Sequence, residues 1–535
     1  MTEISFLAYV PDPFAVQTSH FLIRKPSGEC LHVNARELSR FPTRLLTYDL
    51  PRLIDDLRRL NHRPPTQILD FGDALRILAG RPKDEGGEKL WNVWPVLKRQ
   101  FANKTDADLF ERLALSREIR PDLGELTRLL EAAGEALADV WRGLESRLRQ
   151  KGEYDRLTTV EWPLQSAFAY RQFLGVRVDA SIAEALLEQI SAEKYAAYRR
   201  VAEHLNRNPT GLNYWNVQQY LSDTDVAYLM DLDPGGQLQS AFEMAALASP
   251  FAEAFVSMMK AGRDGSIVRR ALGGTNRLFP IFHVLGTISG RILVSDPYLQ
   301  QLRRAYRGLI TGEPHHRLIY LDYAQFEPGV LAGLSGDPGL IRAYNEGDLY
   351  SALAELLFDN AAQRPVAKRV FLAFSYGMTP DRIATMLAGD APPGERTTYA
   401  AKITGFFEAF PELASFRARQ NDALIADGYV ASLFGNRRLR TNGGGPLSLK
   451  EQRWALNQPV QSTASLIFKE ALNGIIAEFG VEPVVLPVHD AVLLQFPDDG
   501  DFERRAQCAS EIMVERFTHR IPGVNAKIKA GNFTD

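Results

Sequence analysis

Residues 484–496 constrain the fold of this 535-residue chain more than any other segment. They read Val-Val-Leu-Pro-Val-His-Asp-Ala-Val-Leu-Leu-Gln-Phe, which predicts two apolar strands with His489 and Asp490 at the bend between them. Pro487 cannot donate a ladder hydrogen bond, so we expect the first strand to lie at a sheet edge. A polar pair inside so apolar a run is costly to bury unless it has a partner. A metal ion would be such a partner, although a His-Asp dipeptide alone is weak evidence for one.

A second segment, residues 317–327, places another carboxylate at the end of an apolar strand. Asp322 follows the apolar residues directly, and Pro328 suits the first turn of the helix that comes next. In this position Asp322 could hold a hard cation together with Asp490. An aspartate before a helix is also an ordinary helix cap, and the segment alone does not separate the two interpretations.

The third segment is a predicted helix over residues 364–376, ended by Gly377. Four of its residues recur at intervals of four and form one slowly drifting stripe: Arg364, Lys368, Leu372 and Tyr376. Two cations one turn apart, followed by an aromatic ring, suit a triphosphate with its base and sugar. If only the two cations are considered, a basic surface stripe explains them as well.

Length and charge bound the class of protein. A chain of this length exceeds what one hydrophobic core supports, so we expect several domains, and the order of predicted strands and helices indicates the α+β class. The 62 Lys and Arg nearly balance the 65 Asp and Glu. Residues 260–310, however, hold nine basic residues against Asp264 and Asp296 alone. This basic strip predicts a polyanion-binding face, with a solvated basic face as the alternative.

Other patterns exclude several classes. No run of about 18 apolar residues predicts a membrane-spanning helix, and the first residues lack a signal-peptide pattern. The two cysteines, Cys30 and Cys508, cannot build a disulfide framework or a cysteine metal site. We therefore expect a soluble, cytosolic protein without a membrane partner.

In chain order, the three segments resemble motifs A, B and C of family A DNA polymerases, the bacterial DNA polymerase I type. Asp322-Tyr323-Ala324-Gln325-Phe326-Glu327 resembles the family's Asp-Tyr-Ser-Gln-Ile-Glu. Arg364-x3-Lys368-x3-Leu372-x3-Tyr376-Gly377 resembles its Arg-x3-Lys-x3-Phe-x3-Tyr-Gly, and Val488-His489-Asp490 its Val-His-Asp-Glu. Further similarity covers residues 289–300, 428–438 and 457–464, so the resemblance runs from about residue 155 to the C-terminus.

The resemblance implies a right-hand polymerase with palm, fingers and thumb, of the compact phage or plasmid kind. We expect an exonuclease-like domain at residues 1–155 and a polymerase domain at 156–535. Within the latter, the expected parts are a thumb at about 180–285, a palm at about 286–340 and 425–535, and fingers at about 341–424. The family's 3′–5′ exonuclease needs an early Asp-x-Glu pair, and no predicted strand in residues 1–60 carries one. The first domain is therefore expected to be degenerate and inactive.

The implied activity is template-directed DNA synthesis, in which dNTPs are added to a primer 3′-end by two-metal nucleotidyl transfer. Asp322 and Asp490 would be the catalytic carboxylates, and together with the backbone of Tyr323 they would hold two Mg²⁺, for which Mn²⁺ can substitute. The implied partners are primer–template DNA and dNTPs, bound by a monomer. The sequence names no accessory protein.

The resemblance also assigns binding roles. Glu327 would crowd the sugar 2′ position and exclude ribonucleotides. The residues expected to bind the nucleotide are Arg364, Lys368, Leu372, Tyr376, Gln325, Glu327 and Tyr350. The residues expected to contact DNA are Arg291, Arg453, Asn457, Gln461 and His489. Three positions depart from the family: Ala491 replaces an acid, Leu372 an aromatic, and Pro328-Gly329 a Leu-Arg pair.

Two alternatives remain open. One is an RNA polymerase or reverse transcriptase of the same palm type, which Glu327 as a steric gate argues against in the case of RNA synthesis. The other is a catalytically dead DNA-binding replication factor. The joint presence of five residues argues against it: Asp322, Asp490, Arg364, Lys368 and Tyr376.

Overall fold

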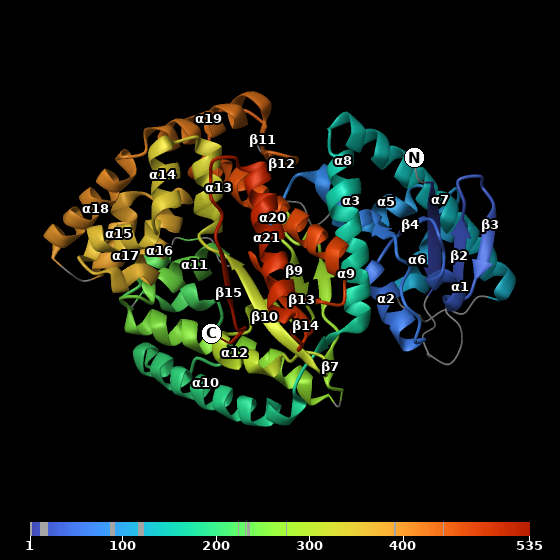
Figure 1. Ribbon diagram of the computed structural model, residues 1–535, viewed down its shortest axis with the longest axis horizontal. Helices are drawn as coiled ribbons and strands as arrows, with labels where there is room; N and C mark the ends of the chain where they lie inside the picture. The colour runs from blue at the N-terminus through green and yellow to red at the C-terminus, as the bar shows by residue number, and fades with distance from the viewer. Residues whose placement is uncertain are drawn as a thin grey trace.

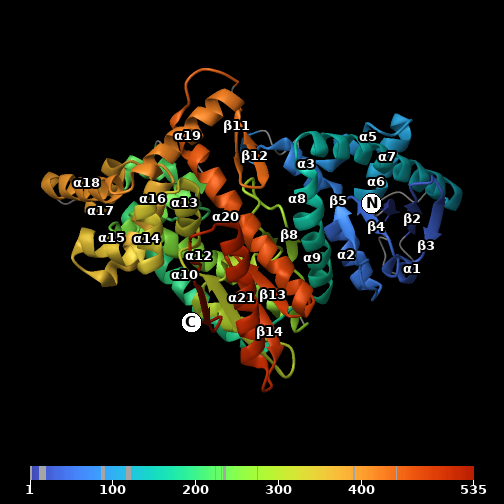
Figure 2. The same cartoon turned by 45° about the horizontal axis from the view of Figure 1, so that its top comes forward.

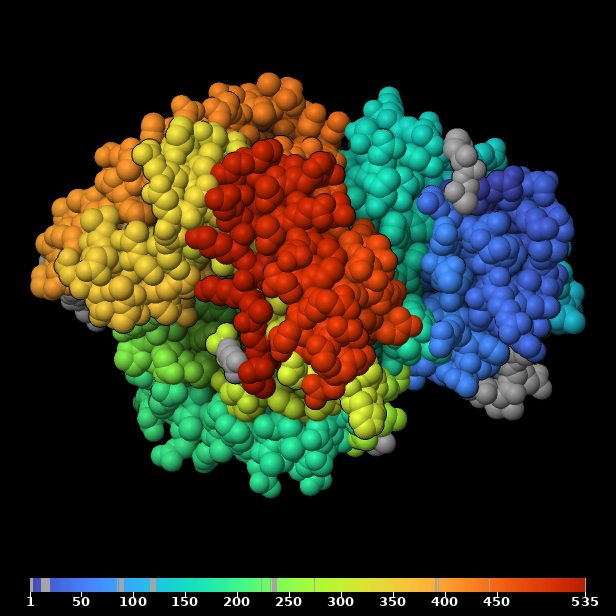
Figure 3. Space-filling model, in the orientation of Figure 1, coloured from blue at the N-terminus to red at the C-terminus, as the bar shows by residue number. Residues whose placement is uncertain are grey.

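The computed structural model describes residues 3–10, 20–85, 91–115, 122–222, 224–230, 232, 236–273, 275–389, 392–441 and 443–534. These residues form an N-terminal lobe and a larger body from which helical arms extend (Figures 1 and 2). In the space-filling view, the blue lobe stands beside the red C-terminal segments with a teal helical segment between them (Figure 3). No helix among the described residues is long and apolar enough to cross a membrane.

The N-terminal lobe is built on a mixed sheet in the order β3-β2-β1-β4-β5. Strands β1 to β3 are antiparallel neighbours, whereas β4 and β5 run parallel to β1. β1 is buried along nearly its whole length because every residue from Phe6 to Val10 is apolar. The strands are β1 (Ile4–Val10), β2 (His20–Arg24), β3 (Cys30–Val33), β4 (Arg44–Thr47) and β5 (Ile68–Asp70).

Helices cover this sheet and enclose one hydrophobic core with it. The longest, α7, presents Leu at helical spacing to β1 and β2 and begins at Asp122, whose side chain accepts the Glu125 amide. The helices of the lobe are α1 (Ala35–Ser39), α2 (Leu50–Arg59), α3 (Phe71–Ala79), α5 (Val93–Lys98), α6 (Lys104–Leu115) and α7 (Leu123–Gln150).

A continuous helical stretch connects the lobe to the body. It comprises α8 (Tyr154–Arg156), a π-helical turn (Leu157–Glu161) and α9 (Trp162–Leu174). α9 packs against α2 and β5 of the lobe and against the long C-terminal helix α20 (Leu449–Phe479) of the body. The two parts of the molecule therefore share a packed interface.

The body is centred on an antiparallel sheet in the order β13-β14-β10-β15. β13 lies at the edge, as Pro487 predicts. Helices α13 (Phe326–Ser335), α20 and α21 (Phe502–Arg520) pack around the sheet (Figure 1). The strands are β10 (His316–Tyr323), β13 (Val484–Val488), β14 (Ala491–Pro497) and β15 (Ile528–Gly531).

Two helical arms flank this sheet. The first arm has a core of its own and consists of α10 (Ala183–Leu205), α11 (Gly236–Ala245) and α12 (Pro250–Arg269). The second consists of α14 (Pro338–Glu346), α15 (Leu349–Phe358), α16 (Arg364–Ser375), α17 (Pro380–Ala388), α18 (Pro393–Glu408) and α19 (Pro411–Asp427). Gly377, with φ +84°, follows the end of α16 as the sequence predicts.

Short elements complete the fold. A hairpin of β11 and β12 packs on α19, α20 and α3. The remaining strands are β6 (Val176–Arg177), β7 (Arg277–Leu278), β8 (Ile281–His283), β9 (Leu293–Ser295), β11 (Tyr429–Ser432) and β12 (Gly435–Leu439). Short 3₁₀ turns span Lys83–Glu85, Ala180–Ile182, Val217–Tyr220, Ala227–Leu229, Arg270–Leu272, Leu299–Gln301, Arg304–Leu309 and Ala361–Gln363. The mixture of helix and sheet confirms the α+β class.

Candidate active site

The central sheet brings the two predicted catalytic carboxylates together. Asp322 lies on β10 directly opposite Ala491 of β14, so the preceding residue, Asp490, is beside it. His489 makes the sharp bend between β13 and β14 with a left-handed backbone, φ +57°, and its side chain is exposed. Burial, reinforced by the charge of Asp490, raises the pKa of Asp322 to about 6. The site thus concentrates negative charge.

This pair of carboxylates fits a hard divalent cation. Among the described residues, neither Asp322 nor Asp490 has a hydrogen-bond or ion-pair partner, so their oxygens are available as ligands. No group of three or more His, Cys, Asp or Glu in the described part of the chain is arranged to hold a metal. A cation here would keep coordination positions for water and phosphate, as Mg²⁺ prefers.

Tyr323 anchors the strand end beneath the carboxylates. Its hydroxyl donates to the Met513 carbonyl of α21 at 2.6 Å, and its ring stacks on Phe326 with centroids 4.1 Å apart. The next residue, Ala324, donates its amide to the Lys527 carbonyl at 2.8 Å. These contacts fix the backbone where it leaves the sheet.

Helix α16 directs two cations to this region. Lys368 is exposed, and its charge opposes the rise in the pKa of Asp322. Arg364 is paired with Asp348 at 2.7 Å, and its guanidinium lies 5.1 Å from the centre of the buried Tyr350 ring. The lysine is therefore free to move, whereas the arginine has a fixed position.

Glu327 is a buried carboxylate in the first turn of α13. Burial raises its pKa to about 7, although the Arg291 guanidinium, which donates to Oε1, opposes that rise. Its Oε2 atom is buried without a partner among the described residues. Gln325 has a left-handed backbone and accepts the Leu349 amide at 3.1 Å, so its side chain is directed to α15.

The remaining predicted nucleotide residues lie elsewhere. Leu372 and Tyr376 line a cavity of about 630 Å³ between the first arm, helices α16 and α17, and α20. Neither catalytic carboxylate is among the residues that line it. Arg453 and Asn457 line the same cavity, and the Asn457 amide oxygen is buried without a partner in the described part of the chain.

Helix α20 presents the predicted DNA-contacting residues on one face. Arg453, Asn457 and Gln461 are partly exposed, whereas residues 454–456 and 458–460 between them are buried. Their four-residue spacing thus gives a single accessible stripe along an otherwise buried stretch of α20, residues 453–461.

The basic strip at residues 260–310 differs from the sequence expectation. The sequence suggested a dense cluster of unpaired positive charges, but in the structure many of these cations form ion pairs with carboxylates. The pairs are Lys260–Glu243, Arg270–Asp296, Arg277–Glu313, Arg291–Glu327, Arg303–Asp264 and Arg303–Glu193. The strip is therefore partly neutralised within the protein, because several of the partners lie outside the strip in sequence.

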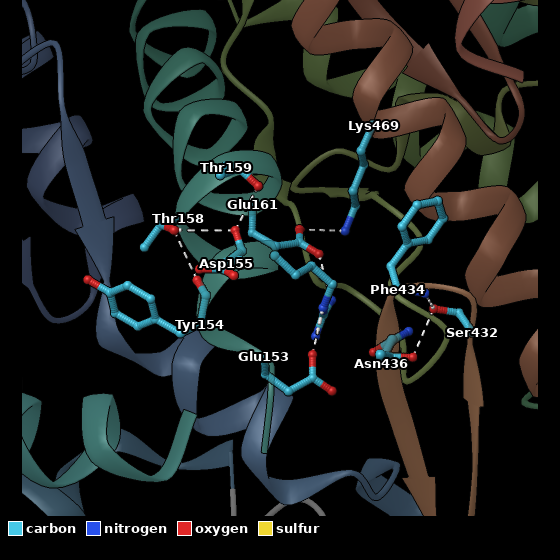
Figure 4. Close-up of polar contacts among 12 residues, drawn as sticks. Glu153, Tyr154, Asp155, Thr158, Thr159, Glu161, Ser432, Phe434, Asn436 and Lys469 are labelled. Atoms are coloured by element: carbon cyan, nitrogen blue, oxygen red, sulfur yellow. Dashed lines mark hydrogen bonds and ion pairs between the residues drawn. The ribbon is translucent and has the colours of Figure 1, made fainter. Parts of the chain in front are cut away.

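A buried charge network that the sequence did not reveal lies behind the site (Figure 4). Glu161 accepts from Arg156 at 2.8 Å and from Lys469 of α20 at 2.7 Å, and Arg156 also donates to Glu153 at 2.8 Å. All four side chains are at most 2% exposed. Glu153 reaches the β11–β12 hairpin, where a Cβ on Gly435 would lie 2.8 Å from its Oε2 atom.

This network extends to the loop that carries Arg291. Asn436, the neighbour of Gly435, donates to the Ile288 carbonyl at 3.3 Å, and Gln458 donates to the same oxygen at 3.1 Å. A Cβ on Gly290 would come within 3.6 Å of Lys469 Nζ. Asn436 and Gln458 thus hold the loop from which Arg291 reaches Glu327.

Comparison with solved structures defines the class of fold. The chain superimposes with a TM-score of 0.72 on a structure described as the POL domain of Pol1 from M. smegmatis in complex with DNA primer-template and dNTP, at 18% identity. The match covers 99% of this chain and 95% of that one. The fold is therefore that of a right-hand polymerase.

Sequence comparison then gives the family. The profile of DNA polymerase family A matches residues 218–533, and the chain belongs to that family. It is 29% identical over 431 residues to the thermostable DNA polymerase I of Thermus filiformis, covering 75% of this chain and 50% of the relative. It is 25% identical over 431 residues to DNA polymerase I of Geobacillus stearothermophilus, covering 75% and 48%. The chain thus spans about half the length of the curated relatives it matches.

Proposed function

We propose that this protein is a template-directed DNA polymerase that adds dNTPs to the 3′-end of a primer. The observation that carries the proposal is the pairing of β10 with β14, which sets Asp322 beside Asp490. Family membership supports the same conclusion. In-line phosphoryl transfer depends on positioning and charge neutralisation, which a pair of carboxylates supplies through bound cations.

Asp322, Asp490 and the Tyr323 backbone would hold two Mg²⁺ ions, with Mn²⁺ as a substitute. Bound there, such ions would lower the pKa of the primer 3′-hydroxyl and stabilise the departing pyrophosphate. Lys368, exposed on α16, would contact the triphosphate, with Arg364 held one turn away by Asp348. Glu327 would face the sugar 2′ position, where its bulk favours a deoxyribose.

The α20 stripe and the cavity beside it would receive primer–template DNA. Arg453, Asn457 and Gln461 are the accessible residues of that helix stretch, so their side chains would meet the minor-groove edges of the bases. Arg291 and His489 would contact the DNA close to the carboxylates. Leu372 and Tyr376, at the end of α16, would border the nascent base pair from the cavity side.

We further propose that residues 1–155 form an exonuclease-like domain without nuclease activity. The acids of the lobe serve its own structure. Asp70 accepts the amides of Leu50 and Gly72, and Asp73 is paired with Arg76 at 3.0 Å. β1 carries no acidic residue. A polymerase of this kind would act as a monomer in the cytoplasm of a bacterial or infected cell.

Primer extension tests the proposed activity and separates the alternatives. The full chain is incubated with Mg²⁺, a labelled primer on a DNA or an RNA template, and either dNTPs or rNTPs. We expect extension with dNTPs on DNA. Extension only with rNTPs, or only on RNA, would indicate an RNA polymerase or a reverse transcriptase, and binding without extension would indicate a DNA-binding factor.

A further inference from the structure

A carboxylate of the N-terminal lobe reaches across to the body and binds two of its cations. Glu85, at the end of the 3₁₀ turn after α3, lies 3.2 Å from Arg438 of β12 and 3.2 Å from Lys450 of α20. The Leu439 amide also donates to the Gly80 carbonyl at 2.7 Å. Only 12% of the Glu85 side chain is exposed, against 49% for Lys450. This contact is termed the Glu85 clasp below.

The two cations of the clasp belong to the wall of the 630 Å³ cavity described above. Five basic side chains line that cavity among the described residues: Arg369, Arg382, Arg438, Lys450 and Arg453. Glu243 is the one acidic side chain among the described lining residues, and it is paired with Lys260 of α12. The cavity therefore has the charge of a polyanion site, and Glu85 contacts two of its five cations and offsets one of their two charges.

Carboxylate and phosphate compete for the same donors. An arginine guanidinium binds either group through charge-assisted hydrogen bonds, and a lysine ammonium binds either as a point charge. Because Lys450 stays half-exposed while it contacts Glu85, a phosphate can approach it without prior rearrangement. Lys450 also lies one helical turn before Arg453, the first residue of the α20 stripe.

We propose that Arg438 and Lys450 form a binding site for backbone phosphates of a nucleic acid, and that Glu85 occupies this site when no nucleic acid is bound. The inference rests on the proposed polymerase function, because it takes the cavity as the path of the DNA. The lobe then weakens DNA binding by the body, since each engagement of the site must first displace Glu85.

The test measures primer–template affinity as a function of salt for the full-length wild type and the Glu85→Gln variant. Glu85→Gln removes the carboxylate charge that both cations contact, so the slope of log K against log salt should steepen by about 0.9 for each phosphate gained. At about 0.1 M salt, the dissociation constant should fall roughly tenfold. The control is Glu145→Gln, which removes the same charge from an exposed pair with Arg149 in the same lobe and should change neither quantity.

A second substitution assigns the gain to this site. Lys450→Gln should weaken primer–template binding less in the wild type, where the lysine must first leave Glu85, than in the Glu85→Gln background. In the Glu85→Gln background it should remove about 0.9 of the added slope. An unchanged or weaker affinity of Glu85→Gln, or a gain that Lys450→Gln does not reverse, would overturn the inference.

Hydrogen exchange on the wild-type chain provides a test that needs no variant. If phosphate displaces Glu85, adding primer–template should accelerate amide exchange at residues 80–85 and at Leu439, whose amide bonds to the lobe. Unchanged or slower exchange there would contradict the displacement. If the wild type binds no primer–template, the proposed function itself is contradicted. If it binds without these changes in exchange, only the proposed displacement of Glu85 is contradicted.

Discussion

Glu327 has one charged partner, Arg291, and one buried oxygen without a partner among the described residues. If its bulk excludes the ribose 2′-hydroxyl, Glu327→Ala should raise ribonucleotide incorporation relative to dNTPs by about 10- to 100-fold. Single-nucleotide extension kinetics with matched dNTP and rNTP measure this ratio. Glu327→Gln keeps the bulk without the charge and should retain most of the discrimination. Unchanged selectivity in the alanine variant would assign the gate to another residue.

His283 gives a prediction for stability against pH. Burial, with Arg76 and Lys83 nearby, lowers the pKa of this imidazole to about 4, and its Nε2 lies 2.8 Å from Ser295 Oγ. Between pH 4 and 6.5 the unfolded chain binds the proton and the folded one does not. The contribution of the neutral imidazole to the free energy of unfolding is therefore fully present above pH 6.5 and is lost as the pH falls toward 4.

The His283→Gln variant should lose this dependence. Between pH 7 and pH 5, the wild type should lose about 1–2 kcal/mol more of its free energy of unfolding than the variant. Urea denaturation at the two pH values measures the free energy of unfolding of both proteins. Other titrating groups, such as Asp73, are present in both, so the difference between the proteins reports on the imidazole. A variant as acid-sensitive as the wild type would show that His283 does not titrate in this way.

At the scale of elements, the Glu153–Arg156–Glu161–Lys469 network joins the π-helical turn to α20. Removing one member leaves a buried charge without its partner, which typically costs about 3–5 kcal/mol. Lys469→Met should therefore lower the free energy of unfolding by about this amount in urea denaturation. The double variant Glu161→Gln with Lys469→Met removes both charges and should be more stable than Lys469→Met alone.

An exposed ion pair supplies the control for this experiment. Arg149→Met breaks the pair with Glu145 on α7, where solvent screens the charges, and should cost less than about 1 kcal/mol. If Lys469→Met costs no more than Arg149→Met, the buried network does not stabilise the junction of lobe and body.

At the scale of the whole molecule, the lobe is expected to lack proofreading. Asp70 accepts two backbone amides and Asp73 pairs with Arg76, whereas an exonuclease needs several carboxylates that converge on a metal pair. A primer with a mismatched 3′-end, incubated with Mg²⁺ and no nucleotide, should keep its full length. Shortening that survives Asp322→Ala but disappears on Asp70→Asn would make the lobe an active nuclease.

The sequence predicted correctly those structural features that depend on residues close together in the chain. The strand that ends at Asp322, the bend at His489 and the helix that ends before Gly377 each follow from a dozen neighbouring residues, and the structure contains all three. The edge position of β13 followed from Pro487 alone.

The contacts that sequence reasoning missed join distant residues. Glu85 and Arg438 are 353 positions apart, and Glu161 and Lys469 are 308 apart. No periodicity encodes such a pair, because the fold alone decides which charges meet. The net positive charge of the basic strip was overestimated for the same reason. Part of that charge is neutralised by residues outside the strip, namely Glu193, Glu313 and Glu327. A glutamate or lysine within an apolar run, such as Lys469, is the one available signal of a buried partner.

The central claim is that Asp322 and Asp490 hold the catalytic cations, and one measurement tests it most directly. Primer extension and primer–template affinity are measured in Mg²⁺ for the wild type, Asp322→Ala and Asp490→Ala. We expect each substitution to reduce the extension rate by about a thousandfold or more, because the cation sites lose half their carboxylates. Affinity should change by less than about threefold, because basic residues supply most of it. Near-normal extension by either variant would contradict the account.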